Sequence, residues 1–135
     1  TGIALGQFQK AEHKGALVGN PLKIAMLPPR DELYTRIDSR FDAMLEQGAM
    51  GEVEQLIGRQ LDPSLPLMKA LGVTALKAVL DQKMTIDEAA YIAKRDSRHY
   101  AKRQMTWLRN NYNAQITLNT KLSESLMESI FSLIR

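Results

Sequence analysis

Hydrophobic residues recur along this chain at the three- and four-residue spacing of helices that bury one face. A first stripe, which precedes Gly48, consists of Leu33, Ile37, Phe41, Met44 and Leu45. A second stripe, which precedes Gly58, consists of Met50, Val53, Leu56 and Ile57. Glycine is favoured at the end of a helix because it readily adopts the left-handed backbone conformation. We therefore predict two consecutive amphipathic helices that end at these glycines.

Two prolines interrupt the helical pattern between Asp62 and Pro66 and exclude a regular helix across that connection. The helical pattern resumes afterwards and reaches Val79 and Leu80, with Gly72 inside it. Because glycine within a helix costs about 1 kcal/mol relative to alanine, Gly72 requires a compensating reason. Helix–helix packing and the close approach of another backbone or a nucleotide are both open explanations.

A long helix is predicted to begin after Thr85 and to end within residues 110–113. Thr85 and Glu88 have the spacing of a capping box, in which each side chain bonds the backbone N–H of the other residue. One broad side of this helix is largely apolar and carries Ile86, Ala89, Ala90, Ala93, Tyr100, Ala101, Gln104, Trp107 and Leu108. The roughly opposite sector is basic and carries Arg95, Arg98, Lys102 and Arg109.

Gln104 and Trp107 lie on the apolar side of the long helix, so we expect both to face the protein core. A buried amide without a partner costs about 1 to 3 kcal/mol, and Gln104 should therefore bond a neighbouring segment or, alternatively, touch substrate. Trp107 is the only tryptophan, and we predict that it anchors the core rather than stacks on a base.

A short apolar run from Leu22 to Leu27, stopped by two prolines, is typical of a strand buried on both faces of a parallel sheet. The only other candidate strand is residues 115–118. Because a lone buried strand needs partners, we predict an α/β parent, to which this chain contributes a predominantly α-helical piece with one or two short strands. A terminal amphipathic helix over residues 121–135 is predicted to place Glu124 and Glu128 outside. Its predicted inner face consists of Leu122, Leu126, Ile130, Leu133 and Ile134.

Composition excludes several kinds of chemistry. Of the 135 residues, 44% are hydrophobic and 24% charged, as in an ordinary globular domain. There is no cysteine, and His13 and His99 are far apart, so we predict no metal site. We find no apolar run of membrane-spanning length and no leader, and we expect a cytoplasmic protein. Since the chain starts at Thr1 without an initiator Met, we expect it to be a fragment.

The net charge of +3 becomes informative through its distribution. Residues 94–109 contain six of the eighteen basic residues, and Asp96 is the only acid among them. Such a concentration indicates a polyanionic partner, although a merely solvated helix face explains the charge equally well. The segregation of the cations opposite the apolar side favours the nucleic-acid hypothesis.

The basic region also carries a familiar motif. Lys102-Arg103-Gln104-Met105-Thr106-Trp107-Leu108-Arg109, preceded by Ser97-Arg98-His99-Tyr100-Ala101, closely resembles the carboxy-terminal part of bacterial tRNA dimethylallyltransferases (tRNA isopentenyltransferases). The pattern of that family reads approximately Ser/Thr-Arg-x-x-Ala-Lys-Arg-Gln-x-Thr-Trp-Leu/Phe-Arg. Gly48 to Val53 and Lys69-Ala70-Leu71-Gly72 resemble the family as well, and a weaker resemblance extends from Thr1 to about Leu118.

The resemblance implies a parent of P-loop nucleoside-triphosphatase-like architecture. Residues 1–20 would then return from a helical insertion domain, residues 21–120 would complete the catalytic core, and residues 121–135 would form the terminal helix. The implied tRNA-binding residues are Lys69, Ala70, Leu71, Gly72, Val73, Thr74, Lys102, Arg103, Gln104, Met105, Thr106, Trp107, Leu108 and Arg109. Family members usually have Gly-Tyr-Arg or Gly-Tyr-Lys where this chain has Gly72-Val73-Thr74, so Lys69 and the Gly72 backbone carry over best.

Two arginines are candidates for binding a diphosphate. The resemblance directs Arg98 toward that group, and the family pattern Arg-Ile-x-x-Arg-Phe, matched at Arg36 and Arg40, implies phosphate contact by Arg36. The residues alone favour a different interpretation of Arg36 and Arg40, namely surface ion pairs with Asp38, Glu32 or Glu46.

Enzymes of the resembled family transfer the dimethylallyl group of dimethylallyl diphosphate to N6 of the adenosine 3′-adjacent to the anticodon, with Mg²⁺ and a phosphate loop holding the diphosphate. No such loop and no suitable catalytic aspartate occur in this sequence, so the isolated chain is predicted to be inactive, with no bound cofactor. We expect a monomeric parent whose partners are the tRNA anticodon stem-loop and dimethylallyl diphosphate. A non-enzymatic RNA-binding module and a helical interaction domain are the alternatives.

Overall fold

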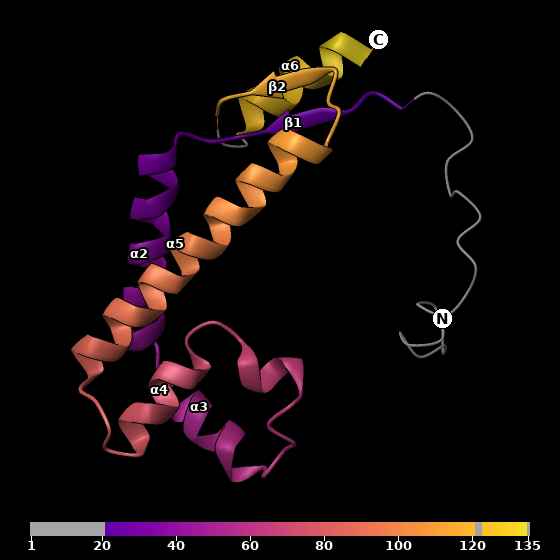
Figure 1. The fold of residues 1–135 in the computed structure, drawn as a ribbon. Coiled ribbons are helices and arrows are strands. Elements are labelled where there is room, and N and C mark those ends of the chain that lie inside the picture. The colour runs from indigo at the N-terminus through magenta and orange to yellow at the C-terminus, as the bar shows by residue number, and fades with distance from the viewer. Residues whose placement is uncertain (1–20, 121–122, 135) are drawn as a thin grey trace.

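The computed structural model describes residues 21–120 and 123–134 and, at the C-terminus, side chains as far as residue 132. Figure 1 shows the strands and the C-terminal helix at one end, the long helices through the middle and the short helices at the other end. In chain order the elements are β1 (Ile24–Met26), α2 (Arg30–Glu46), α3 (Ala49–Gly58), the 3₁₀ helix η1 (Pro66–Lys69), α4 (Val73–Leu80), α5 (Ile86–Asn111), β2 (Ile116–Leu118) and α6 (Glu124–Ile134). The prediction for residues 1–20 lies outside the described residues.

The two predicted strands form a parallel pair. β1 aligns with β2 so that Ile24 faces Ile116 and Met26 faces Leu118. The backbone N–H of Leu27 extends this ladder by donating to the carbonyl of Leu118 at 2.8 Å. Ala25 and Leu27 are buried, whereas Ile24 and Met26 are only half-buried, because a pair of strands covers little of either face. The predicted strand is confirmed, but its burial on both faces is not reached within the described residues.

Helices α2 and α5 lie side by side and run in opposite directions (Figure 1). Two ion pairs join them in the order that an antiparallel pair requires. Lys94 Nζ lies 2.5 Å from Asp42 Oδ1, and one turn further along α5, Arg98 Nη1 lies 2.6 Å from Asp38 Oδ1. Residues on each helix that are four apart share a face, so the two pairs form consecutive rungs between the helices.

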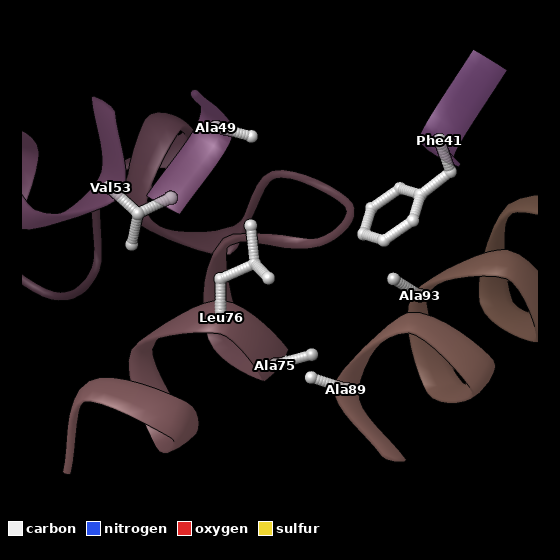
Figure 2. Packing of buried hydrophobic residues seen from close by; sticks show 7 residues of the cluster. All are labelled: Phe41, Ala49, Val53, Ala75, Leu76, Ala89 and Ala93. Atoms are coloured by element: carbon white, nitrogen blue, oxygen red, sulfur yellow. The ribbon is translucent and has the colours of Figure 1, made fainter. Parts of the chain in front are cut away.

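The core lies where α3 and α4 pack against the facing halves of α2 and α5. Figure 2 shows Phe41, Ala49, Val53, Ala75, Leu76, Ala89 and Ala93 of this cluster. The methyl groups of Ala75 and Ala89 point toward each other, and the Phe41 ring points toward Ala93. Ala89 and Ala93 are 0% and 1% exposed, because small side chains let α4 and α5 approach closely. The predicted amphipathic helices are confirmed, with α2 ending just before Gly48 and α3 ending at Gly58.

Gly72 stands at the start of α4 rather than inside a helix, as N-cap, with φ of +90°. A Cβ atom at this position would lie 3.1 Å from Cε2 of Phe41, which is tighter than ordinary packing. The glycine is therefore required by its backbone conformation and by an aromatic side chain of the core. Of the two explanations offered by the sequence, packing is the one that the structure supports.

The predicted capping box at the start of α5 is confirmed. The backbone N–H of Glu88 donates to the Thr85 hydroxyl at 3.2 Å, and the N–H of Thr85 donates to the Glu88 carboxylate at 2.7 Å. The backbone N–H of Thr85, followed by its hydroxyl, lowers the pKa of Glu88 below its ordinary value, since both bonds favour the ionised carboxylate. α5 then continues to Asn111, as the turn-favouring residues predicted.

The terminal helix is observed as α6. Leu126 and Ile130 are half-buried, and Glu124 and Glu128 are exposed, in agreement with the predicted faces. Leu122 and the side chains of Leu133 and Ile134 lie outside the described part. Within residues 21–120 and 123–134, no helix has both the length and the apolar character needed to cross a membrane.

Candidate nucleic-acid interface

The C-terminal half of α5 is largely uncovered by the described part of the chain. Ala101 and Met105 are buried against neighbouring segments, but Trp107 is 58% exposed and Tyr100 is 47% exposed. Gln104 is exposed as well. The predicted core positions of Gln104 and Trp107 are therefore wrong in this structure. The apolar side of α5 is broad, whereas α4 covers only its first turns and α2 covers one flank, so the remainder of that side stays open.

A shallow groove of about 500 Å³ follows this open part of α5. Its lining consists of His99, Lys102, Arg103, Thr106, Trp107, Asn110 and Asn111. The groove combines two cations and an indole with amide groups, and its volume is that of a site for a small organic group. An exposed indole beside cations can stack on a base while the cations contact phosphate.

The six cations of residues 94–109 divide into two sets. Lys94, Arg95 and Arg98 lie close to the carboxylates of Asp42, Asp96 and Asp38. Lys102, Arg103 and Arg109 have no ion-pair partner among the described residues. The Arg103 guanidinium instead lies 5.6 Å from the centroid of the Tyr100 ring. The second set is therefore available to an anionic ligand, and it coincides with the residues of the motif.

Arg98, a candidate for the diphosphate, is engaged within this chain. Its Nη1 donates to both carboxylate oxygens of Asp38, at 2.6 and 2.7 Å, and the bond is partly buried. The surface-pairing interpretation expected Asp38 to pair with Arg36 or Arg40. In the structure, Asp38 pairs instead with Arg98 of the neighbouring helix. Arg36 and Arg40 are exposed on α2. Binding of a diphosphate by Arg36 and Arg98 stays a prediction.

The second implied tRNA-binding segment, residues 69–74, joins η1 to α4. Leu71 is exposed and lines a hollow of about 400 Å³ to which Arg40, Tyr100 and Gln104 also contribute. The fold therefore brings Leu71 and the motif residue Gln104 to one place, although 33 positions separate them in the chain. Lys69, Ala70 and Thr74 are exposed, whereas Val73 packs against the core cluster.

Two residues that the sequence did not single out lie beside the motif. Arg30 and Tyr34, from the first turns of α2, line a small hollow together with Lys102, Met105, Thr106 and Arg109. The only signal for them in the sequence is their spacing of four residues near the start of a helix. Because such pairs are common, that spacing does not identify a site.

The described residues contain no preformed cluster of metal ligands. No three side chains among His, Asp and Glu come together there in a group that could hold a metal ion. Mg²⁺ prefers several oxygen ligands in octahedral geometry, which requires such a cluster or substrate phosphates. A Mg²⁺ ion bound beside this part of the chain would therefore need ligands from substrate phosphates, from water or from other residues.

Comparison with known proteins identifies the family. The model of the family described as "IPP transferase" matches residues 1–111. A tRNA dimethylallyltransferase from Hyphomonas neptunium is 41% identical over 136 residues, which cover 100% of this chain and 43% of the relative. One from Maricaulis maris is 44% identical over 134 residues, covering 99% of this chain and 44% of that protein. The chain therefore spans less than half the length of these relatives.

Solved structures give the same answer. A crystal structure from Staphylococcus epidermidis, described as tRNA delta(2)-isopentenylpyrophosphate transferase, superposes with a TM-score of 0.74 at 34% identity and covers 84% of this chain and 37% of that chain. A tRNA isopentenylpyrophosphate transferase from Bacillus halodurans gives a TM-score of 0.73 at 34% identity, covering 87% of this chain and 40% of the other. The mostly helical fold with its parallel strand pair is thus shared with these enzymes, and the match over residues 1–111 shows that the chain belongs to the IPP transferase family.

Proposed function

We propose that this chain is the carboxy-terminal, tRNA-binding part of a prenyltransferase that modifies tRNA. The complete protein would transfer a dimethylallyl group from dimethylallyl diphosphate to N6 of the adenosine 3′-adjacent to the anticodon. Its phosphate loop and general base would lie in a P-loop-type core outside these residues. The substrates would be those of the family, and this chain would contribute the binding of RNA.

The observation that carries the proposal is the contrast in pairing along α5. Lys102, Arg103 and Arg109 have no carboxylate partner in the described part of the chain, and Lys102 and Arg103 border the groove with the exposed Trp107. Unpaired cations beside an open aromatic ring suit a polymer that has both phosphates and bases. A merely solvated helix face would not need its only tryptophan 58% exposed beside them.

In such an enzyme these residues would position the RNA rather than read its sequence. Contacts to phosphate fix the register of the backbone and have no direct dependence on base identity. The groove would bind part of the anticodon stem-loop and help to orient it so that the target amine meets the allylic carbon from the correct side. The RNA itself would help to exclude water, which competes with the amine for that carbon.

The transferase activity is tested by the intact mass of an unmodified anticodon stem-loop RNA after incubation with the complete protein, dimethylallyl diphosphate and Mg²⁺. We expect a gain of one dimethylallyl unit at the adenosine beside the anticodon. Binding without any mass gain from well-folded protein would instead favour a non-enzymatic RNA-binding module.

The RNA-binding role has its own test in the variant Lys102→Ala with Arg103→Ala. We expect weaker RNA binding and a flatter dependence of affinity on salt, because two phosphate contacts and their counterion release are lost. The matched control is Arg59→Ala with Lys83→Ala, which removes the same charge from exposed positions outside the groove. An unchanged affinity and salt slope in the first variant would rule out a phosphate role for Lys102 and Arg103.

A further inference from the structure

The small hollow between the start of α2 and the end of α5 is lined by three cations. Arg30 comes from α2, and Lys102 and Arg109 come from α5, with Tyr34, Met105 and Thr106 completing the lining. Among the described residues, no carboxylate belongs to this lining. Three like charges that face one space repel one another, and an anion in that space relieves the repulsion. The hollow therefore has the charge of an anion site.

Hydrogen bonds within the hollow leave suitable donors for such an anion. Nε of Arg30 donates to the Tyr34 hydroxyl at 2.9 Å, and the guanidinium carbon lies 5.0 Å from the centroid of the Tyr34 ring. Since the tyrosine oxygen accepts this bond, its own O–H remains available for donation. The Thr106 hydroxyl, in contrast, donates to the carbonyl of Lys102 at 2.9 Å. Tyr34 thus holds Arg30 in place and adds a neutral donor to the three cations.

The size of the hollow restricts the kind of anion. Its volume is about 100 Å³, well below the roughly 300 to 1,000 Å³ of pockets that enclose small organic ligands. A single tetrahedral oxyanion is compatible with that volume, whereas a nucleoside is not. Arginine with its planar fork and a tyrosine hydroxyl are also typical partners of phosphate oxygens.

We propose that Arg30, Tyr34, Lys102 and Arg109 together bind one phosphate group of the RNA backbone. The neighbouring groove supports this source, because Lys102 and Thr106 line both spaces. A polynucleotide can thus place a base near Trp107 and an adjacent phosphate between the two helices. This site extends the RNA-binding surface from α5 onto α2 and rests on the proposed function.

The test compares Arg30→Gln with the control Arg59→Gln. Arg59 is an exposed arginine that lines neither the groove nor the small hollow. Binding of the anticodon stem-loop RNA to the complete protein is measured by fluorescence anisotropy across a series of salt concentrations. We expect Arg30→Gln to reduce the slope of log K against log salt by about 0.7 to 0.9, the change for one lost phosphate contact. The control should retain the wild-type slope. Tyr34→Phe, which keeps the ring but removes the donor, should weaken binding.

A double-mutant cycle shows whether the two helices hold the same phosphate. Arg109→Gln alone should weaken binding, and Arg30→Gln should add little in that background, because one shared contact is lost only once. Melting temperatures of all variants, compared with the wild type, confirm that each remains folded.

Three results would overturn the site in distinguishable ways. If Arg30→Gln keeps the wild-type slope while Lys102→Gln lowers it, the RNA-binding proposal stands and the α2 contribution is refuted. If inorganic diphosphate raises the melting temperature of the wild type but not of Arg30→Gln, and the RNA slope is unaffected, the hollow binds a small phosphate compound instead. If the wild type shows no salt-dependent RNA binding, the proposed function fails as well.

Discussion

The two halves of α5 are built from similar residues and have different environments. The first half buries Ala89 and Ala93 against α4 and α2, and its cations Lys94 and Arg98 are paired with aspartates of α2. The second half leaves Trp107 exposed, and Lys102, Arg103 and Arg109 have no carboxylate partner in the described residues. One helix thus serves to hold the fold together at one end and to present charge at the other.

The comparison shows that a basic stripe on a helix need not have one role. In the first half, Lys94 and Arg98 are paired with aspartates of α2, and Arg95 is paired with Asp96 of α5 itself. These charges therefore contribute little to an external field. The charges of the second half retain their attraction for an anion because no carboxylate among the described residues is paired with them. Breaking an ion pair of the first half should therefore lower stability, whereas removing an unpaired cation of the second half should weaken RNA binding.

The largest expected effect is on the packing that holds the first half. Phe41→Ala removes a ring that is only 6% exposed and packs among α4 and α5, so the free energy of unfolding should fall by about 3 to 5 kcal/mol. Urea denaturation measures the change. Phe131→Ala on α6 is the matched control, since that ring is 57% exposed and its loss should cost far less. Equal losses in the two variants would contradict the assignment of the core.

A smaller loss is expected at the start of α4. Gly72→Ala forces a side chain onto a backbone with φ of +90° and places its Cβ 3.1 Å from the Phe41 ring, so unfolding should become easier by about 1 to 3 kcal/mol. Gly51→Ala is the control, because Gly51 lies in α3 and no atom of the described residues lies within 4 Å of an added Cβ. That control should be neutral or stabilising, as alanine favours helices. A neutral Gly72→Ala variant would refute the requirement for glycine.

The contrast between the two halves is tested most directly by measuring both stability and RNA binding for one variant of each half. Asp38→Asn breaks the ion pair with Arg98 and should lower the free energy of unfolding by about 1 kcal/mol, since the pair is only partly buried. It should not reduce the salt slope of RNA binding. Lys102→Gln should reduce that slope and leave stability nearly unchanged. If Asp38→Asn also flattened the slope, the division of roles along α5 would be wrong.

The smallest effect concerns pH. The lowered pKa of Glu88 means that its ionised carboxylate stabilises the folded state at neutral pH, and this contribution disappears as the pH falls through the lowered value. Wild type should therefore lose more stability than Glu88→Gln when the pH is lowered below about 4, the ordinary range of carboxyl groups. Thermal unfolding across that pH range measures the difference. If the melting temperatures of the two proteins fell in parallel as the pH was lowered, Glu88 would not contribute to the acid sensitivity.

Local signals in the sequence determined much of this structure. The capping box at Thr85 and the turn-favouring asparagines around Asn110 bounded the longest helix, because capping and turn formation depend on residues a few positions apart. The apolar run before Pro28 predicted β1, and the motif from Lys102 to Arg109 indicated the family. Each of these inferences uses side chains that interact with their own segment or repeat at a fixed spacing.

Only the tertiary structure decided which faces are covered and which charges are paired. Periodicity placed Trp107 and Gln104 on the apolar side of α5, but it cannot show where the packing partner ends, and both side chains are exposed. Likewise, Arg98 pairs with Asp38 across a separation of 60 positions, and Arg30 reaches the hollow beside Arg109 from a different helix. Burial and ion pairing depend on contacts between distant segments, which no local pattern in the chain contains.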